Sequence, residues 1–499
     1  MQHRIRTLIT ALSEHMYERE HMIALSLLAG IAGANTFLYG APGTAKSLIS
    51  RRIAAAFEVE RYFEYLMNRF STPEELFGPV SLKALKQDQY TRKTAQYLPK
   101  AEVAFLDEIW KASPAILNTL LTLLNEKIFK NGDEIETVPL QVLMSASNEI
   151  PQPEQGLDAL YDRFILRLVV QPIQKPDNFF ALLQAGPSQP LPQHAIQAIS
   201  LAELRQWRSQ IHAVQLNPDI LSAFLEIKTQ LSQEFAEHQV YVSDRRWQRV
   251  AYLIKTAAFL NGRDMVLISD LFILKHCLWN QLNEISFVNE VVNTVVLRQG
   301  LSHDLNLERY VLDKEQLEQD ILNHAYYTED VYYSYLINGV DYLHVTTNLD
   351  HYYQNKSLYL ALDKFGTHKD FFALDASGEE VRGIVCNFNG TTQCTLKGGY
   401  YGLEEVVSPQ IKYSKGSVRS EVDSTKQQQL RVQLQRLQYA FSQEQQLLQQ
   451  RVAQYDAALD SVFVEPADRI MLRQQIQEQL QRYALQIQDC ERLDQLCQP

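Results

Sequence analysis

The stretch Gly40-Ala41-Pro42-Gly43-Thr44-Ala45-Lys46-Ser47 decides how the rest of this chain is interpreted. It follows a short β-rich run, Thr36 to Tyr39, and precedes residues with helical periodicity. Small residues let successive backbone N–H groups curl around a phosphate, a Lys reaches the β- and γ-oxygens, and a hydroxyl at the helix start holds Mg²⁺. Lys46 and Ser47 fit these roles, whereas Ala45 stands where the usual pattern has Gly. The octet predicts a phosphate-binding loop.

Two further strands carry the other residues that such a site needs. The apolar run Val103 to Leu106 ends in the paired acids Asp107 and Glu108, the arrangement known as Walker B. Asp107 can reach the ligand shell of Mg²⁺, and Glu108 can orient and polarise the attacking water. A third apolar run, Leu140 to Ala146, is followed by Asn148, whose amide can hold that water or sense the γ-phosphate. The order of these elements predicts ATP binding and hydrolysis, with ATP, ADP and Mg²⁺ as ligands.

Arginines in two places are candidates for reading the nucleotide. Arg163, directly before a fourth apolar run, is predicted to act as an arginine finger. Such an Arg, supplied by a neighbouring subunit, stabilises the charge of the phosphoryl-transfer transition state. Arg167 is the second candidate for this role. Further along the chain Arg245 is predicted to sense the nucleotide state, with Arg246 and Arg249 as alternatives.

The apolar pattern predicts a multidomain chain that begins with an α/β nucleotide-binding fold. Near-continuous apolar strands with helices between them indicate a parallel sheet covered on both faces. After a Gly- and Pro-rich linker at 186–192, helical periodicity dominates, and a later Tyr- and Gly-rich stretch predicts about six short strands. Apolar residues at alternating four and three spacing in the Gln-rich tail predict two long helices, which with a third over 305–325 would form a rod. The expected divisions are a nucleotide-binding domain at 1–190, a helical lid at 195–280, a discontinuous helical rod at 281–330 and 424–499, and an inserted partner-binding β domain at 331–423.

The composition limits the class of protein. Across 499 residues, the hydrophobic fraction of 46% and the charged fraction of 21% are typical of a globular chain with several domains. The formal net charge of −12 argues against a protein that mainly holds nucleic acid. The five cysteines have no zinc-like spacing, so reduced thiols are expected. Neither a secretory signal nor a membrane-length apolar run is recognisable, so a cytoplasmic location is expected.

These motifs together resemble the MoxR branch of the AAA+ ATPases. The segments that carry the resemblance are Arg69 to Glu74, Tyr97-Leu98-Pro99, Leu106-Asp107-Glu108-Ile109, Leu117 to Glu126, Ser145 to Glu149 and Ala159 to Phe164. Ala at position 45 is usual in that branch, so the departure from the general loop pattern supports the resemblance. Within the branch, the layout is most similar to regulatory ATPase variant A (RavA), through Tyr17-Glu18-Arg19, Phe63 to Met67, Asp107 to Ala112 and Val242 to Trp247. The likeness is dense over residues 15–280 and is one of architecture over 281–499.

The resemblance implies a hexameric ring in which each ATP lies between subunits and Arg163 acts in trans. It also implies which residues contact the nucleotide, with Tyr17 near the adenine: Tyr17, Gly43, Thr44, Ala45, Lys46, Ser47 and Leu48. MoxR members usually remodel, activate or chaperone other proteins and often pair with a von Willebrand factor A-type partner. RavA-like members also engage an inducible lysine decarboxylase through the inserted β domain.

The leading hypothesis is therefore a protein-remodelling ATPase that captures a partner with its β domain. The alternatives are a nucleic-acid-translocating AAA+ motor and a nucleotide-gated scaffold with little turnover. The acidic balance disfavours the motor, and the intact set of Asp107, Glu108, Asn148 and Arg163 disfavours the scaffold. The sequence leaves the client protein and the ring size open.

Overall fold

The chain forms two compact units, Met1–Asp304 with Gln446–Gln481, and Leu305–Gln445 with Arg482–Pro499. The structure is a computed structural model that describes residues 1–151, 156–184, 197–232, 239–300, 304–325, 330–347, 356–365, 367–388, 393–398, 403–409, 411–413, 423–459 and 461–497. The linker predicted at 186–192 lies outside the described residues. None of the helices in the described ranges has both the length and the hydropathy needed to cross a bilayer.

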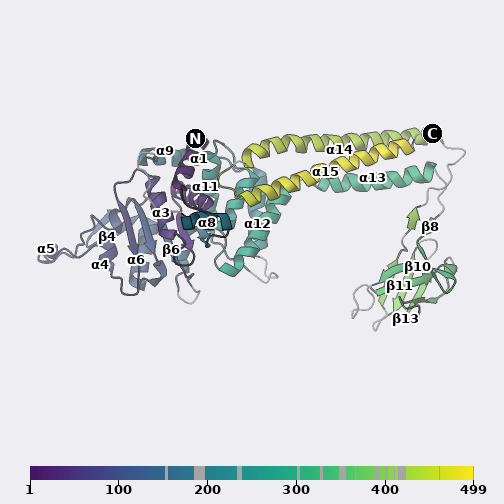
Figure 1. Cartoon of the computed structure of the whole chain (residues 1–499), viewed down its shortest axis with the longest axis horizontal. Coiled ribbons are helices and arrows are strands. Elements are labelled where there is room, and N and C mark those ends of the chain that lie inside the picture. The colour runs from purple at the N-terminus through teal and green to yellow at the C-terminus, as the bar shows by residue number, and fades with distance from the viewer. Residues whose placement is uncertain are drawn as a thin grey trace. The chain divides into compact units, whose positions relative to one another are not determined.

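A five-stranded parallel sheet lies at the centre of the first unit (Figure 1). Its strands, in spatial order, are β2 (Tyr62–Leu66), β3 (Val103–Asp107), β6 (Val142–Ser147), β1 (Asn35–Tyr39) and β7 (Phe164–Val169). Four of these strands occupy the predicted apolar runs. The edge strand β2 is only partly buried, so it lacks the continuous apolar pattern of the others. Because all pairings are parallel, β1, β3 and β6 end at the same edge of the sheet.

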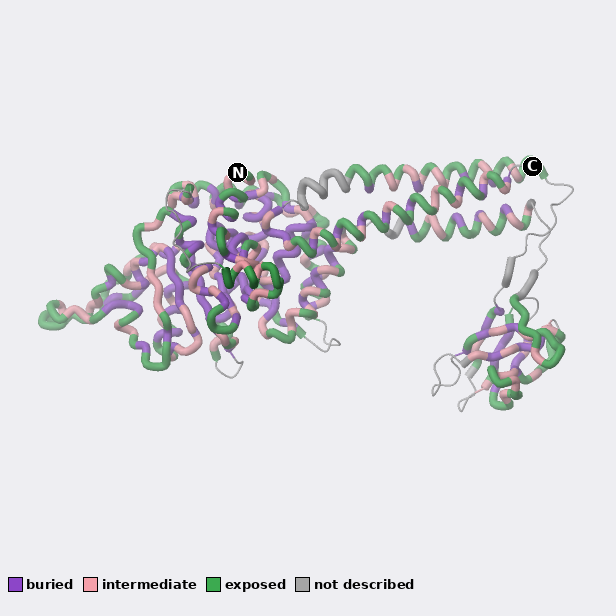
Figure 2. The backbone as a smooth tube through the Cα atoms, in the orientation of Figure 1, coloured by how far each residue is buried: buried purple, intermediate pink, exposed green. Residues whose placement is uncertain are grey.

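Side chains of this sheet alternate between two hydrophobic clusters on its opposite faces. Phe37 and Ala104 belong to one cluster, and their neighbours Leu38 and Phe105 belong to the other. The first face is covered by α6 (Pro114–Glu126), and the second by α2 (Glu20–Ala32) and α3 (Lys46–Ala55), with α1 (Gln2–Leu12) in the same cluster. Figure 2 shows the strands as buried, in agreement with a sheet covered on both sides.

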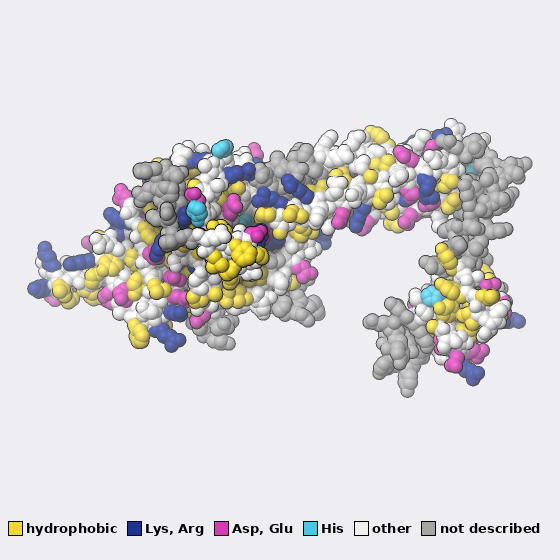
Figure 3. All heavy atoms as spheres, viewed as in Figure 1, with side chains coloured by type: hydrophobic (Ala, Val, Ile, Leu, Met, Phe, Trp, Pro, Cys, Tyr) yellow, Lys and Arg dark blue, Asp and Glu magenta, His cyan; other side chains and the backbone are white. Residues whose placement is uncertain are grey.

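Short elements connect and decorate this core. They are α4 (Pro73–Phe77), α5 (Leu82–Leu85), η1 (Leu98–Lys100), η2 (Ile109–Lys111), the hairpin of β4 (Ile128–Asn131) and β5 (Glu134–Thr137), α7 (Asp158–Tyr161) and α8 (Pro176–Gln184). The helix α8 has no buried residue. Its side chains Phe179, Phe180, Leu182 and Leu183 are between 46% and 66% exposed and form an apolar patch on the surface (Figure 3).

A helical lid completes the first unit. It contains α9 (Leu201–Ile211), α10 (Pro218–Ser232), α11 (Asp244–Leu260), η4 (Ile268–His276), η5 (Leu282–Glu284) and α12 (Ile285–Gly300). The prediction that residues 281–330 belong to the rod is wrong for α12. Its valines are buried in the core of the first unit, where the helix packs on η4 and α10: Val288, Val291, Val292, Val295 and Val296. An apolar stripe predicts a helix but not the surface that the helix covers.

Three helices pack together in the second unit: α13 (Asp304–Ala325) and the adjoining parts of α14 (Ser424–Leu459) and α15 (Pro466–Leu496). Phe441 is completely buried between the rings of Tyr310 and Tyr483, at centroid distances of 5.7 and 6.5 Å. An ion pair joins Lys314 to Asp489 across two of these helices.

The second unit also contains a seven-stranded antiparallel sheet. In spatial order its strands are β15 (Leu403–Val407), β14 (Cys394–Gly398), β13 (Glu380–Phe388), β12 (Phe371–Leu374), β11 (Lys356–Ala361), β10 (Val340–Thr347) and β9 (Ser334–Ile337). The short η6 (Leu362–Lys364) follows β11, and β8 (Asp330–Tyr332) pairs with β16 (Ile411–Tyr413). The largely exposed β9 precedes the stretch in which about six strands were expected. All five cysteines are free and buried.

Candidate functional site

The predicted phosphate-binding loop joins β1 to α3. Gly43 and Ala45 have φ angles of +79° and +72°, which turn the backbone sharply before the helix begins. Ala45 adopts this left-handed conformation at a cost of about 1–2 kcal/mol, which explains why Gly is usual there. A Cβ at Gly40 would lie 2.4 Å from the carbonyl oxygen of Val170, so the loop also packs tightly against the end of β7.

Lys46 lies in the mouth of this loop. Its Nζ donates to the carbonyl oxygens of Gly40 at 2.6 Å and Ala41 at 2.9 Å. Burial lowers the pKa of Lys46, while the charges of Asp107 and Glu108 act in the opposite direction. The ammonium group is therefore held by two neutral acceptors in a partly desolvated position. Phosphate oxygens would be stronger acceptors for the same donors.

Asp107 and Ser47 meet at the edge of the sheet. Ser47 Oγ lies 3.4 Å from Asp107 Oδ2. Burial raises the pKa of Asp107, and the neighbouring charge of Glu108 adds to this effect. A hydroxyl and a carboxylate are oxygen ligands of the kind that Mg²⁺ prefers, and a cation here would stabilise the ionised carboxylate. The two residues therefore fit the ion that accompanies ATP, whose chemistry is to neutralise charge on the phosphates.

Glu108 is held in a defined position beside Asp107. Its φ angle is +51°, and its N–H donates to Asp107 Oδ1 at 3.0 Å. Its carboxylate pairs with Lys111 Nζ at 3.2 Å and accepts a hydrogen bond from Ser147 Oγ at 3.4 Å. The side chain of Glu108 is only 14% exposed. The left-handed backbone conformation and these contacts together fix the orientation of the Glu108 carboxylate at the end of β3.

Asn148 follows β6, which is the neighbour of β3 in the sheet. Its Oδ1 atom is buried and has no hydrogen-bond partner among the described residues. Such an acceptor is costly, about 1–3 kcal/mol, unless a water or ligand satisfies it. An amide with an unused acceptor at this edge fits the predicted task of holding a water molecule.

Tyr17 lies in the turn between α1 and α2. The next residue, Glu18, accepts hydrogen bonds from the Asn178 side chain and from two backbone N–H groups at the start of α8. These bonds lower the pKa of Glu18 to about 2, so the turn is tied to α8. The same segment reaches α3 through Arg52, whose Nη2 donates to the carbonyl oxygen of Glu14 at 3.4 Å. The turn is thus anchored next to the helix that carries the phosphate loop.

The remaining loop residues are positioned by local contacts. Thr44 Oγ1 donates to the carbonyl oxygen of Ala41 at 2.8 Å, which closes the loop on itself. Leu48, one turn into α3, is half-buried against the main hydrophobic cluster.

The structure separates the two candidate arginine fingers. Arg167 is completely buried in β7, stacks on the ring of Tyr161 at 3.8 Å and donates to the carbonyl oxygens of Phe164 and Trp279. Burial lowers its pKa to about 10. Arg167 is therefore a core residue, and its candidacy as a finger is wrong. Arg163 is half-buried, and its Nε has no hydrogen-bond partner among the described residues.

The lid arginines divide in the same way. Arg246 is 3% exposed and donates to Asp162 Oδ1 from Nε at 2.9 Å and from Nη2 at 2.7 Å, and to Asn280 Oδ1 at 2.8 Å. It joins the lid to the sheet, which removes it from the candidate sensors. Arg245 and Arg249 are exposed. Neighbouring positions on α11 point in directions about 100° apart, so only the fold selects the buried one.

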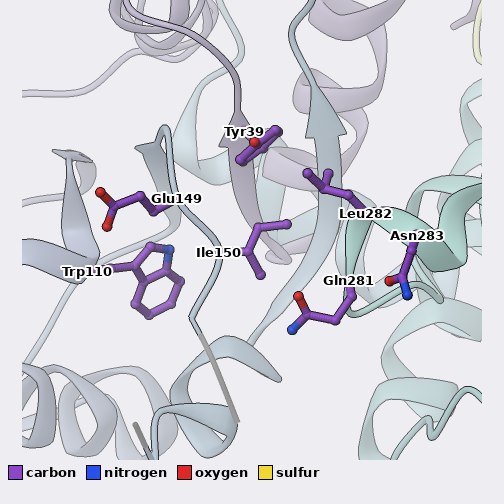
Figure 4. A pocket seen from close by; sticks show the side chains of 7 residues that line it. All are labelled: Tyr39, Trp110, Glu149, Ile150, Gln281, Leu282 and Asn283. Atoms are coloured by element: carbon purple, nitrogen blue, oxygen red, sulfur yellow. The ribbon is translucent and has the colours of Figure 1, made fainter. Parts of the chain in front are cut away.

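A cavity of about 460 Å³ lies between the end of β1 and the segment 281–283 (Figure 4). It is lined by Tyr39, Trp110, Glu149, Ile150, Gln281, Leu282 and Asn283. Figure 4 shows Trp110 and Glu149 on one side and the segment 281–283 on the other. The sequence reasoning missed this cavity, and it missed the Glu108 partners Lys111 and Ser147. Lys111 and Ser147 lie close in sequence to the acid pair and to Asn148, and this closeness could have identified them. No sequence feature distinguishes Gln281 as a residue that lines the cavity.

Comparison with known proteins places this site in context. Residues 3–209 match a family model described as the MoxR domain in the MoxR-vWA-beta-propeller ternary systems, and residues 219–292 match an AAA lid domain. An uncharacterized protein of Methanocaldococcus jannaschii is 38% identical over 328 residues, which are 66% of this chain and 81% of the relative. A second uncharacterized protein of that organism is 39% identical over 274 residues, 55% of this chain and 70% of the relative.

Two other proteins are similar to this chain over a smaller part or at lower identity. A structural protein of Acidianus two-tailed virus is 31% identical over 156 residues, 30% of this chain and 25% of that protein. A solved structure from Cytophaga hutchinsonii, provisionally named an ATPase, has a TM-score of 0.48 and 17% identity, covering 59% of this chain and 94% of the other.

Proposed function

This chain belongs to the MoxR family of AAA+ ATPases, and from that membership we propose that it hydrolyses ATP in an oligomeric ring, a hexamer, to remodel, activate or chaperone partner proteins. The observation that carries the proposal is the convergence of Lys46, Ser47, Asp107 and Glu108 at one edge of the sheet. A nucleotide-holding scaffold needs the first two groups, but hydrolysis also needs a positioned carboxylate beside the metal ligand.

The roles follow from these positions. Residues 43–48 bind the phosphates, Tyr17 lies near the adenine, and Ser47 with Asp107 holds Mg²⁺. Glu108 orients the attacking water and Asn148 holds it through its unused acceptor. Arg245, on the lid, senses the nucleotide. Arg249 is the alternative for this role, because its side chain is also exposed.

The proposed ring rests on two surface features. Arg163 is half-buried, and its Nε is buried without a hydrogen-bond partner among the described residues; we assign this residue to the site of another subunit. The helix α8 exposes four large apolar side chains in a nine-residue helix. A second copy of the chain would remove this surface from water. Glu18 connects α8 to the turn that contains Tyr17. Nucleotide binding near Tyr17 would therefore be coupled to a subunit contact made by α8.

Two kinds of protein partner are proposed for this chain. The description of the matching family model supports a von Willebrand factor A-domain protein, with a β-propeller component as a further candidate. Membership of the RavA branch and an inducible lysine decarboxylase partner are proposed from the sequence resemblance alone, and a cytoplasmic location from the lack of a recognisable signal or membrane-length run in the sequence. We assign partner capture to the β domain at 331–423, where Tyr335, Leu336 and Phe372 are between 42% and 73% exposed. We propose a nucleotide-binding domain at 1–190, a helical lid that begins at 195 and includes α12, and a helical rod made of α13 with residues 424–499.

The test is ATP hydrolysis by the purified chain across a protein dilution series, with light scattering on the same samples. Specific activity should rise with concentration and follow ring formation. Lys46→Ala and Glu108→Gln should abolish turnover, whereas Lys86→Ala, an exposed substitution at the end of α5, should not. Phe180→Ser should move assembly and activity together to higher protein concentration. Turnover that is absent, or that is independent of concentration, would refute the ring ATPase.

A further inference from the structure

Two histidines and a glutamate from distant parts of the chain meet on the first unit. His21 lies in the first turn of α2, His276 is the last residue of η4, and Glu465 immediately precedes α15. Glu465 Oε1 is 3.6 Å from Nε2 of His21 and 3.6 Å from Nε2 of His276. One ligand atom from each of the three residues lies within 4.8 Å of the other two. The two imidazole rings are 5.7 Å apart at their centroids and tilted by 56°.

The two ring nitrogens of His21 are buried, although its side chain as a whole is 20% exposed. Neither its Nδ1 nor its Nε2 forms a hydrogen bond with any described residue. A buried polar group without a hydrogen bond costs free energy, and in folded proteins it often marks the place of a water molecule or an ion. Neutral imidazole is the form that ligates metals.

The nearby positive charges do not satisfy Glu465. Lys275 is paired with Asp468 at 2.5 Å. Arg469 donates its Nε to the carbonyl oxygen of Val464 at 3.1 Å. A cation placed between the carboxylate and the two rings would meet the needs of all three groups at once.

We infer that His21, His276 and Glu465 form a binding site for a divalent transition metal, with Zn²⁺ the best match. Two imidazole nitrogens and one carboxylate oxygen are a Zn²⁺ ligand set, whereas Mg²⁺ and Ca²⁺ select oxygen ligands. In a tetrahedral zinc site with bonds of about 2.0–2.1 Å, ligand atoms are about 3.3 Å apart. The two observed separations between Glu465 and the histidines are 3.6 Å, close to that value, and all three ligand atoms lie within 4.8 Å of one another. Glu465 is 42% exposed, so water can provide a fourth ligand.

The site would be structural and separate from the ATP chemistry. Its ligands come from the nucleotide-binding domain, the lid and the start of the last long helix, all within the first unit. One ion would cross-link three segments that are otherwise joined by apolar packing and by pairs such as Lys275–Asp468. This inference does not depend on the proposed ring or on turnover.

The experiment uses the full-length chain, freed of metal with a chelator and titrated with Zn²⁺ against a competing chromophoric chelator. The wild type should bind one equivalent. His21→Gln, His276→Gln and Glu465→Gln should each lose at least about tenfold in affinity, since even changes outside the ligand shell cost that much. Two controls should bind like the wild type: His212→Gln, an exposed imidazole elsewhere, and Asp107→Asn, which alters the proposed Mg²⁺ site.

Two further readouts separate loss of the site from loss of the fold. Zn²⁺ should raise the melting temperature of the wild type and of both controls, while the three ligand variants melt like the metal-free wild type. Co²⁺ should give d–d absorption without a thiolate charge-transfer band. The inference is overturned if the wild type binds no equivalent of Zn²⁺, if the three variants bind as tightly as the wild type, or if the cobalt spectrum shows thiolate ligation.

Discussion

Replacing Asp162 by Ala is expected to weaken the junction between the lid and the nucleotide-binding sheet. Asp162 Oδ2 accepts a hydrogen bond from Ser243 Oγ at 2.7 Å, and Oδ1 accepts two from Arg246 at 2.7 and 2.9 Å. The side chain of Arg246 is 4% exposed and that of Asp162 is 18% exposed. The substitution therefore removes three hydrogen bonds and leaves a buried guanidinium without its carboxylate.

The magnitude follows from this burial. Removing one partner of a buried ion pair costs about 3–5 kcal/mol, most of it because the remaining charge is left unpaired. Arg246 keeps its bond to Asn280 Oδ1 at 2.8 Å, and Asp162 is not fully buried, so the lower end of that range applies. We expect a loss of about 3 kcal/mol in the free energy of unfolding.

Urea unfolding followed by the fluorescence of Trp207 and Trp247, both in the lid, measures this loss. Because the chain has several domains, the midpoint and slope of the lid transition are compared rather than one global free energy. The matched control is Asp244→Ala, whose carboxylate is 96% exposed and lies 3.5 Å from Lys228. An exposed pair of this kind contributes about 1 kcal/mol or less.

A double-mutant cycle then tests the physical cause. If the unpaired charge dominates, Asp162→Ala combined with Arg246→Met should be less destabilising than the sum of the two single substitutions. The reasoning is refuted if Asp162→Ala costs no more than the exposed control, or if the two substitutions are additive.

Three other predictions concern the loop, the acid pair and the second unit. Gly40→Ala should weaken the binding of a fluorescent ATP analogue by at least about tenfold. The new Cβ would lie 2.4 Å from the carbonyl oxygen of Val170, so the loop must move. An affinity equal to that of the wild type would contradict this prediction. Lys111→Met should lower kcat about tenfold with KM nearly unchanged, because Glu108 loses the 3.2 Å partner that orients it. A rise in KM with kcat unchanged would instead indicate a binding role. Phe441→Ala should cost about 3–5 kcal/mol in urea unfolding of the second unit, since the ring is completely buried between two tyrosines; an unchanged midpoint would show that the three-helix packing is wrong.

The sequence by itself determined the coarse fold and the core of the candidate site. The phosphate loop, the acid pair and four of the five strands were recognisable because each is encoded by contiguous residues. Small residues, a Lys and a hydroxyl must follow one another for a loop to wrap a phosphate, and buried parallel strands must be continuously apolar. The partly exposed β2 does not obey that second rule, and it was not predicted as a strand.

Only the tertiary structure decided between residues whose local sequences are equally suitable. Arg163 and Arg167 lie four residues apart, yet one keeps an unpartnered Nε and the other is enclosed between the sheet and Trp279. The valines of α12 predicted a helix, but their burial in the first unit depends on η4 and α10. The trio of His21, His276 and Glu465 comes from three distant segments. Periodicity encodes which residues share a face, whereas which faces meet is fixed by packing between segments far apart in the chain.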